Sequence, residues 1–176
     1  LNHVLTRFLA FARPRPLEQN EFDIMGEIES AIALLQSGPQ DGPTVRFVVD
    51  RRLDGPIMVR GDREQLRQVL LNILLNARQA SGERGEVRVR CEVHNRSLHW
   101  IVQDAGPGFS REAIDNAFTP FFTTKPQGTG LGLAISHKII ESHGGRISVG
   151  NDKAGGAVVE VEIPIQEEHA QNSFDR

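Results

Sequence analysis

Residues 128–133 read Gly-Thr-Gly-Leu-Gly-Leu and run directly into a helical pattern. Glycine permits positive φ and carries no Cβ, so three alternating glycines can form a loop that lies tightly against a phosphate chain. The helix that follows directs its free N–H groups and the positive end of its dipole at the same place. Such a loop is a weak signal alone, and its interpretation depends on two motifs upstream.

The first upstream motif is a helix predicted over residues 63–80, with Asp62 as N-cap and Gln65 completing a capping box. One face is an apolar core stripe, and beside it lies a stripe of five amides: Gln65, Gln68, Asn72, Asn76 and Gln79. Asparagine is a poor helix former, and half-buried amides are costly without partners, which argues against a merely solvated face. An amide oxygen is a neutral, hard ligand that Mg²⁺ accepts when triphosphate oxygens and water complete its octahedron.

The second upstream motif is Asp104-Ala-Gly-Pro-Gly108, which follows an alternating strand pattern. A carboxylate at a strand end, before a sharp bend, can accept a hydrogen bond from an exocyclic amine at the bottom of a pocket. That chemistry selects adenine over guanine. An ordinary Asp-Gly-Pro turn is the alternative, and the motif alone does not choose between the two.

The segment between the glycine motifs, residues 118–126, reads Phe-Thr-Pro-Phe-Phe-Thr-Thr-Lys-Pro. Three phenylalanines in a loop need burial or gate a site, so we expect either a lid over a ligand or a packed Ω-loop. Lys125 is the only lysine between the two motifs and is our candidate for contacting a γ-phosphate. The rival cation, Arg78, lies about 120° round the helix from the amide stripe.

The remaining helices and strands are predicted from the pattern of hydrophobic residues. Further helices are predicted over residues 24–36, 111–117 and 130–142, and strands over 45–51, 57–60, 85–94, 98–104, 146–150 and 157–163. Neighbouring strands in pairs, with a turn at residues 54–56 between the first two, indicate hairpins. We therefore predict an α+β fold: a two-layer α/β sandwich with a mixed, mostly antiparallel sheet and helices on one face, without regular βαβ alternation.

The composition fits one globular domain, with 176 residues, 39% of them hydrophobic, and a net charge of -3. The near balance of charge gives no support for a nucleic-acid partner. Cys91 is the single cysteine and lies in an alternating apolar stretch, so we expect it in the core and a reducing, cytoplasmic setting. No apolar run is long enough to cross a membrane, and the histidines show no metal-binding spacing.

The chain begins with a helical pattern over residues 1–12, which Arg13-Pro-Arg-Pro16 ends. We expect it to be a piece of a longer protein. The expected division is a helix end and linker over residues 1–16, the main domain over 17–166 and a flexible tail over 167–176.

These motifs, in this order, resemble the catalytic ATP-binding domain of bacterial two-component sensor histidine kinases, a Bergerat-type fold. The resemblance covers about residues 18–165, and residues 1–16 resemble the end of the second helix of the dimerisation and phosphoacceptor domain. The compact lid resembles that of the nitrogen-regulation class. The motifs that match are the N box (68–77), the first glycine box (104–108), the F box (118–122), the second glycine box (128–133) and the third (155–156).

The resemblance implies a protein-histidine kinase with ATP and Mg²⁺ as cofactors. Asn76 would hold the metal, Asn72 would support it or touch phosphate, and Asp104 would bind the adenine amine. Many members carry a lysine where this chain has Gln79, which strengthens the case for Lys125. The expected catalytic residues are Asn72, Asn76 and Lys125. The expected nucleotide-binding residues are Asn72, Asn76, Gln79, Asp104, Gly106, Gly108, Phe109, Thr124, Lys125, Gly128, Thr129, Gly130, Leu131, Gly132 and Leu133.

The implied partners are a histidine-containing dimerisation domain of the same kinase and a response regulator, with a homodimer in the full-length protein. His3 is followed by Val4 and lies on the wrong helix, so no phosphoacceptor is expected in this chain. Whether this fragment is monomeric and whether its parent is membrane-anchored stay open. The alternatives are an ATPase of the gyrase, chaperone or mismatch-repair group, a serine-directed anti-sigma kinase, and an ATP-binding module without turnover.

Overall fold

The computed structural model describes residues 17–37, 44–51, 55–83, 85–126 and 128–165. The expected N-terminal helix, linker and C-terminal tail lie outside these residues. The elements are β1 (Gln19–Asp23), α2 (Ile24–Ser37), β2 (Arg46–Arg51), β3 (Met58–Asp62), α3 (Arg63–Ser81), β4 (Glu86–His94), β5 (Ser97–Asp104), α4 (Arg111–Asp115), α5 (Gly132–Ser142), β6 (Arg146–Asn151) and β7 (Ala157–Pro164).

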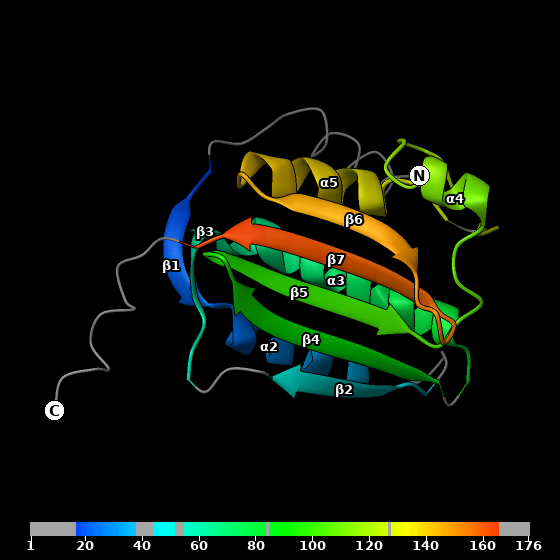
Figure 1. Ribbon diagram of the computed structural model, residues 1–176, viewed down its shortest axis with the longest axis horizontal. Helices are drawn as coiled ribbons and strands as arrows, with labels where there is room; N and C mark the ends of the chain where they lie inside the picture. Colours follow the sequence, from blue (N-terminus) through cyan, green and yellow to red (C-terminus); the bar gives the residue numbers. More distant parts are fainter. Residues whose placement is uncertain (1–16, 38–43, 52–54, 84, 127, 166–176) are drawn as a thin grey trace, which may run out of the picture.

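The main sheet has five strands in the order β2-β4-β5-β7-β6. Strand β2 runs parallel to β4, and the other neighbours are antiparallel. Helices α2, α3 and α5 cover one face of this sheet (Figure 1). The predicted fold class, a two-layer sandwich with a mixed and mostly antiparallel sheet, is confirmed.

The predicted pairing of neighbouring strands is wrong at the N-terminal end. Strands β2 and β3 belong to different sheets, because β3 pairs antiparallel with β1 in a separate two-stranded sheet. We did not predict β1. Only Phe22 of its five residues has a buried side chain, so no alternating pattern marks the strand, and its partner lies about 40 positions away in the sequence.

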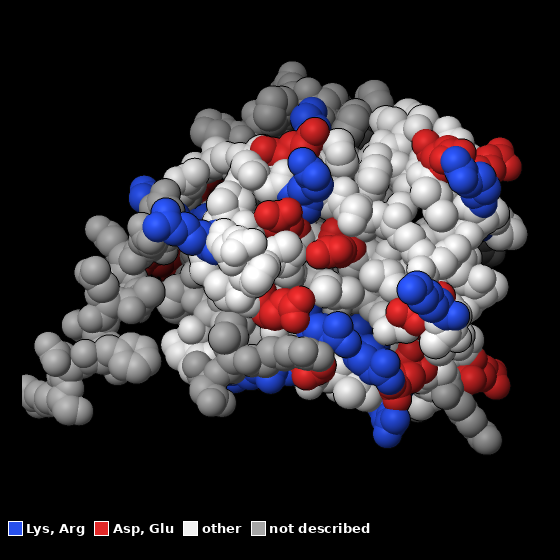
Figure 2. Space-filling view, in the orientation of Figure 1, with Lys and Arg blue, Asp and Glu red and all other residues white. Residues whose placement is uncertain are grey.

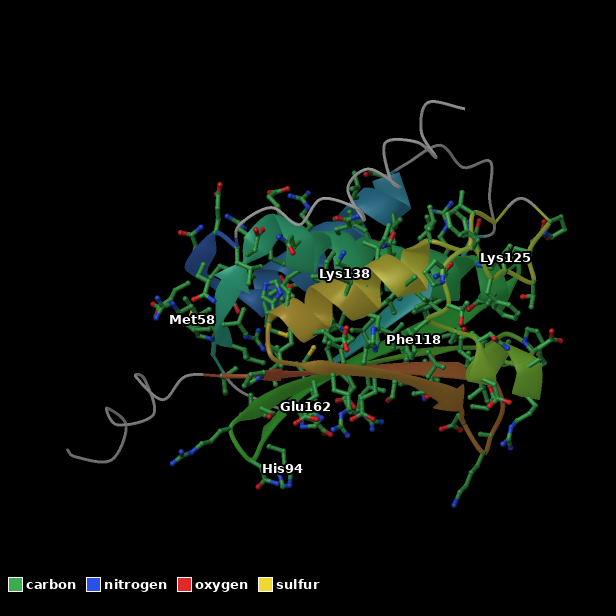
Figure 3. The ribbon with its side chains drawn as sticks, turned by 90° about the horizontal axis from the view of Figure 1, so that it is seen from above. Met58, His94, Phe118, Lys125, Lys138 and Glu162 are labelled. Carbon is green, nitrogen blue, oxygen red and sulfur yellow. The ribbon has the colours of Figure 1, made fainter. Side chains whose placement is uncertain are left out.

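The core lies between the sheet and the helices. The predicted apolar stripe of α3 is buried there, together with the inward residues of β4 and β5. Cys91 is fully buried, as expected, and Trp100 is the largest side chain with no exposed surface. Seen edge-on, the helices lie on one side of the sheet and Glu162 on the other (Figure 3). Acidic and basic side chains are interspersed over that open face (Figure 2).

Helix α3 begins as predicted, with the Asp62 carboxylate accepting from the Gln65 N–H at 3.0 Å. The second bond of the expected capping box differs, because Gln65 Nε2 donates to the Asp62 carboxylate. The Asp62 N–H donates instead to His143 Nε2 at 3.0 Å, which ties the end of α5 to the start of α3. Helix α5 begins two residues later than predicted, and α4 ends two residues earlier.

None of the helices in the described ranges combines the length and the apolar character needed to cross a bilayer.

Candidate active site

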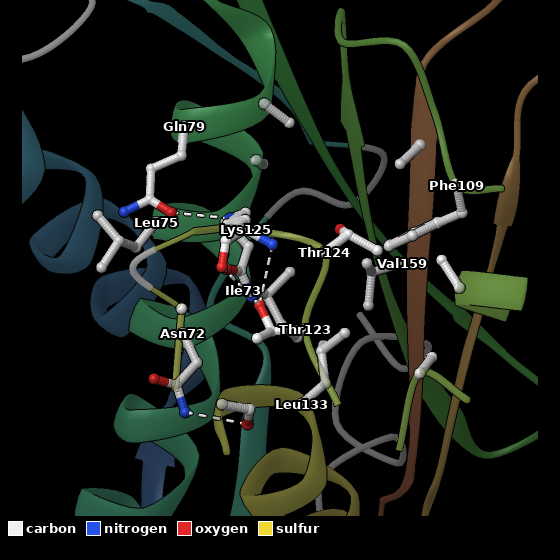
Figure 4. A pocket seen from close by; sticks show the side chains of 18 of the residues that line it. Asn72, Ile73, Leu75, Gln79, Phe109, Thr123, Thr124, Lys125, Leu133 and Val159 are labelled. Carbon is white, nitrogen blue, oxygen red and sulfur yellow. Dashed lines mark hydrogen bonds between the residues drawn. The ribbon is translucent and has the colours of Figure 1, made fainter. Parts of the chain in front are cut away.

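A cavity of about 920 Å³ opens at the C-terminal end of α3. Its walls come from α3, the end of β5 with the turn after it, the segments over residues 122–126 and 128–130, and the first turn of α5 (Figure 4). This volume lies within the usual range for small-molecule sites. The site therefore unites three motifs that are far apart in the sequence.

Thirteen of the fifteen residues predicted for nucleotide binding line this cavity, and Gly106 and Leu131 do not. Gly106 packs against the end of α3, where an added Cβ would lie 2.6 Å from the Ala80 carbonyl oxygen. The Leu131 side chain is fully buried in the core. Any contact of these two residues with a ligand would have to come from their backbones.

Three residues of the amide stripe reach the cavity, namely Asn72, Asn76 and Gln79, whereas Gln65 and Gln68 do not line it. Asn72 Nδ2 lies 3.4 Å from the Gly132 carbonyl oxygen and 3.5 Å from Ser136 Oγ, the latter also bonded to Gly132. The amide of Asn72 thus joins α3 to the first turn of α5.

Lys125 reaches from the loop to the amides of α3. Its Nζ donates to Asn76 Oδ1 at 3.0 Å and to Gln79 Oε1 at 2.8 Å. Burial lowers the pKa of Lys125, while the negative charge of Asp104 acts in the opposite direction. Arg78, the rival cation, points elsewhere and donates to the Leu35 carbonyl oxygen at 2.6 Å.

Asp104, whose side chain is buried, lines the same cavity. Its Oδ1 accepts from the Gly106 N–H at 2.9 Å and the Ala157 N–H at 3.0 Å. These two bonds fix the carboxylate against the turn and the start of β7. None of the described residues donates a hydrogen bond to Oδ2, so this oxygen is available to an amine donor in the cavity.

The loop before α5 is held against the preceding segment. Gly130 has φ +65°, and an added Cβ there would lie 2.3 Å from the Phe121 carbonyl carbon. The Phe121 N–H donates to the Gly130 carbonyl oxygen at 3.0 Å. The N-cap of α5 is Leu131, which makes no side-chain capping bond. The first-turn N–H groups are thus left for another acceptor, as an anion site at a helix start requires.

Sequence reasoning missed the apolar part of the cavity. This part includes Val102 on β5, Ala157 and Val159 on β7, and the small residues Ala80, Ala113 and Ala117. In the sequence, the strand residues follow the same alternation as the core. The alternation alone does not distinguish a strand residue that lines a ligand cavity from one that packs against another side chain.

The fold and cavity together define an ATP-binding α/β sandwich of the Bergerat type. The chain belongs to the family of histidine kinase-, DNA gyrase B-, and HSP90-like ATPases, whose profile matches residues 61–167. Within this family it is a catalytic domain of the protein-histidine kinase type, and it binds ATP.

Two known proteins, one of them in two structures, illustrate the relationship. Sensor histidine kinase ZraS of Escherichia coli (strain K12) is 34% identical over 166 residues, which are 94% of this chain and 35% of ZraS. The catalytic domain of histidine kinase ThkA is 36% identical with a TM-score of 0.76, covering 84% of this chain and 96% of that domain. ThkA in complex with response regulator protein TrrA is 31% identical with a TM-score of 0.81, and the match covers 94% of this chain and 47% of that chain. The chain thus spans about a third of the length of ZraS.

Proposed function

We propose that this domain transfers the γ-phosphoryl group of Mg²⁺-ATP to a histidine on the dimerisation domain of its own full-length protein. The phosphoryl group would then pass to a response regulator. The observation that carries the proposal is the position of Lys125, held by Asn76 and Gln79 in the cavity that Asp104 also lines. The relationship to ThkA, which forms a complex with a response regulator, supports the relay.

The residues present fit a magnesium ion. Asn76 Oδ1 lies in the cavity and already accepts from a cationic group, the Lys125 ammonium. Asn76 would hold the metal, with phosphate oxygens and water as the other ligands. When bound, Mg²⁺ would neutralise charge on the triphosphate. Lys125 would keep its contact with Gln79 and supply a second positive charge to the γ-phosphate.

Asn72 supports transfer to a protein acceptor over hydrolysis. The related ATPases place glutamate here as the base for water, whereas a carboxamide accepts no proton at neutral pH. Phosphoryl transfer depends mainly on positioning and charge stabilisation, so a kinase needs no general base from this chain. The Asn72 contact with Gly132 gives this residue a positioning role at the phosphate end. An ATPase, a serine-directed kinase and a module without turnover are the competing functions.

We also propose that the parent kinase belongs to the nitrogen-regulation class and acts as a homodimer in the cytoplasm. The compact segment over residues 118–126, which delivers Lys125 to α3, supports the class. The lone and fully buried Cys91 fits a reducing compartment.

A reconstituted phosphotransfer assay tests the function. The chain, labelled ATP and Mg²⁺ are mixed with a separate dimerisation domain that carries its histidine. We expect label on that domain that is labile in acid and stable in base, and none after a histidine-to-alanine change in the acceptor. Asn76→Asp should weaken binding of Mg²⁺-nucleotide. Steady release of phosphate without label on the acceptor would contradict the proposal.

A further inference from the structure

Asn151, the last residue of β6, contacts the wall of the cavity although it is not one of the residues that line it. Its Oδ1 accepts from the Phe109 N–H at 2.6 Å, and its Nδ2 donates to the Phe109 carbonyl oxygen at 2.8 Å. One side chain thus satisfies both backbone groups of one residue, 42 positions away. A carboxamide can make this pair of bonds because it carries a donor and an acceptor side by side.

The backbone around Phe109 is shaped for this contact. Gly108 has φ +80°, and an added Cβ would lie 2.7 Å from Asn151 Oδ1. Only glycine allows both that conformation and that approach. Gly108 and Phe109 both line the cavity, and the half-buried Phe109 ring also packs against the core.

The hairpin that carries Asn151 also holds the carboxylate at this end of the cavity. Its turn is closed by a bond from the Asp152 N–H to the Gly156 carbonyl oxygen, 3.0 Å, and by one from the Gly155 N–H to the Asp152 carbonyl oxygen, 3.0 Å. Directly after the turn, the Ala157 N–H donates to Asp104 Oδ1. The two paired strand ends of one hairpin therefore each hold a residue that lines the cavity, Phe109 and Asp104.

We propose that Asn151 is a positioning residue for adenine nucleotides, which clamps the Gly108–Phe109 wall at a fixed distance from Asp104. The inference rests on the proposed nucleotide function and adds a residue outside the binding motifs. Because the wall is already ordered before binding, less of the binding free energy is lost in ordering it. The clamp therefore raises nucleotide affinity without contacting the ligand.

The test replaces the carboxamide with a carboxylate. In Asn151→Asp, Phe109 N–H keeps an acceptor, but the Phe109 carbonyl oxygen faces a second oxygen in place of a donor. We expect ADP to bind about fivefold more weakly at neutral pH, from the loss of one hydrogen bond. Protonating the new carboxyl, whose ordinary pKa is about 3.9, restores a donor, so the affinity relative to the unchanged protein should recover as the pH falls below about 4.

The matched control is Asn95→Asp in the β4–β5 turn, where the side chain is exposed, does not line the cavity and lies at the other end of the β4–β5 pair from Asp104. Its ADP affinity should equal that of the unchanged protein at every pH. An Asn151→Asp affinity within twofold of the unchanged protein at neutral pH would overturn the proposal. So would a loss that does not vary with pH, because a purely structural defect would not be repaired by one proton.

Amide hydrogen exchange of the unchanged protein tests the clamp if Asn151→Asp does not fold. We expect the Phe109 amide to be protected without nucleotide, as the Asp152 amide in the hairpin turn is expected to be. Exchange of Phe109 at the rate of an open loop would refute the clamp. This measurement needs no ligand, so failure of the unchanged protein to bind ADP would count against the proposed function alone.

Discussion

At the scale of single residues, a substitution of Lys125 tests the proposed contact with the γ-phosphate most directly. Lys125→Met removes the charge and keeps most of the length of the side chain. We expect phosphotransfer per bound ATP to fall by about 100-fold, the usual effect of losing one stabilising group at a charged transition state. ADP lacks the γ-phosphate, so its affinity should change little. The control is Lys153→Met, an exposed lysine in the β6–β7 turn. Loss of ADP binding with unchanged transfer per bound ATP would assign Lys125 to affinity alone.

At the same scale, the reactivity of the Cys91 thiol tests its burial in the core. Burial raises its pKa from 9.0 to about 12, so the folded thiol stays protonated at pH 8. Since the thiolate is the reactive form, we expect iodoacetamide to label Cys91 only after unfolding in urea. Between these two pKa values the folded state binds one more proton, so Cys91 costs stability as the pH rises above about 9.

The change is measured as the difference in unfolding free energy between the unchanged protein and Cys91→Ala. That difference should shrink by up to about 1.4 kcal/mol per pH unit above pH 9. A difference that stays constant to pH 10.5 would contradict the raised pKa.

At the scale of elements, alanine substitutions at two adjacent glycines distinguish the cost of backbone strain from the cost of a steric clash. Gly155 and Gly156 have φ of +104° and +88°, so alanine is strained at both. An added Cβ at Gly155 meets nothing within 4 Å, whereas at Gly156 it would lie 1.9 Å from the Asp104 carbonyl oxygen. We expect Gly155→Ala to cost about 1–2 kcal/mol of stability and to keep ADP binding. Gly156→Ala should displace β5 from β7 and abolish ADP binding. Equal effects of the two changes would refute the steric argument.

The elements that sequence could predict are those whose signals are local. Helix α3 has its cap and its core stripe within 20 residues, and the structure confirms both. The pairing of β1 with β3 could not be predicted, because it depends on backbone bonds between distant segments with mostly exposed side chains. Lys125 and Gln79 were each predicted for the site, but their contact depends on the path of the intervening loop. From the sequence alone, Asn151 is an ordinary turn residue, because its hydrogen-bond partner, Phe109, is 42 positions away.

At the scale of the whole molecule, the cavity is formed by segments that lie far apart in the sequence. A ligand that binds only this assembled form stabilises the fold by mass action. ADP at 100 times its Kd should raise the unfolding free energy by about 2.7 kcal/mol. For a chain of this length, that corresponds to a rise in Tm of about 5–10 °C. A melting curve with and without ADP and Mg²⁺ measures it.

We expect Asp104 to determine which base gives this stabilisation. Asp104→Asn keeps the Oδ1 acceptor that holds Gly106 and Ala157, so the fold should survive. The atom presented to the base becomes an NH₂ donor, which opposes the adenine amine and suits the carbonyl oxygen of hypoxanthine. We therefore expect the variant to lose the Tm rise with ADP and to gain one with IDP, the reverse of the unchanged protein. A variant that melts as the unchanged protein does without ligand, yet still responds to ADP and ignores IDP, would show that another group selects the base.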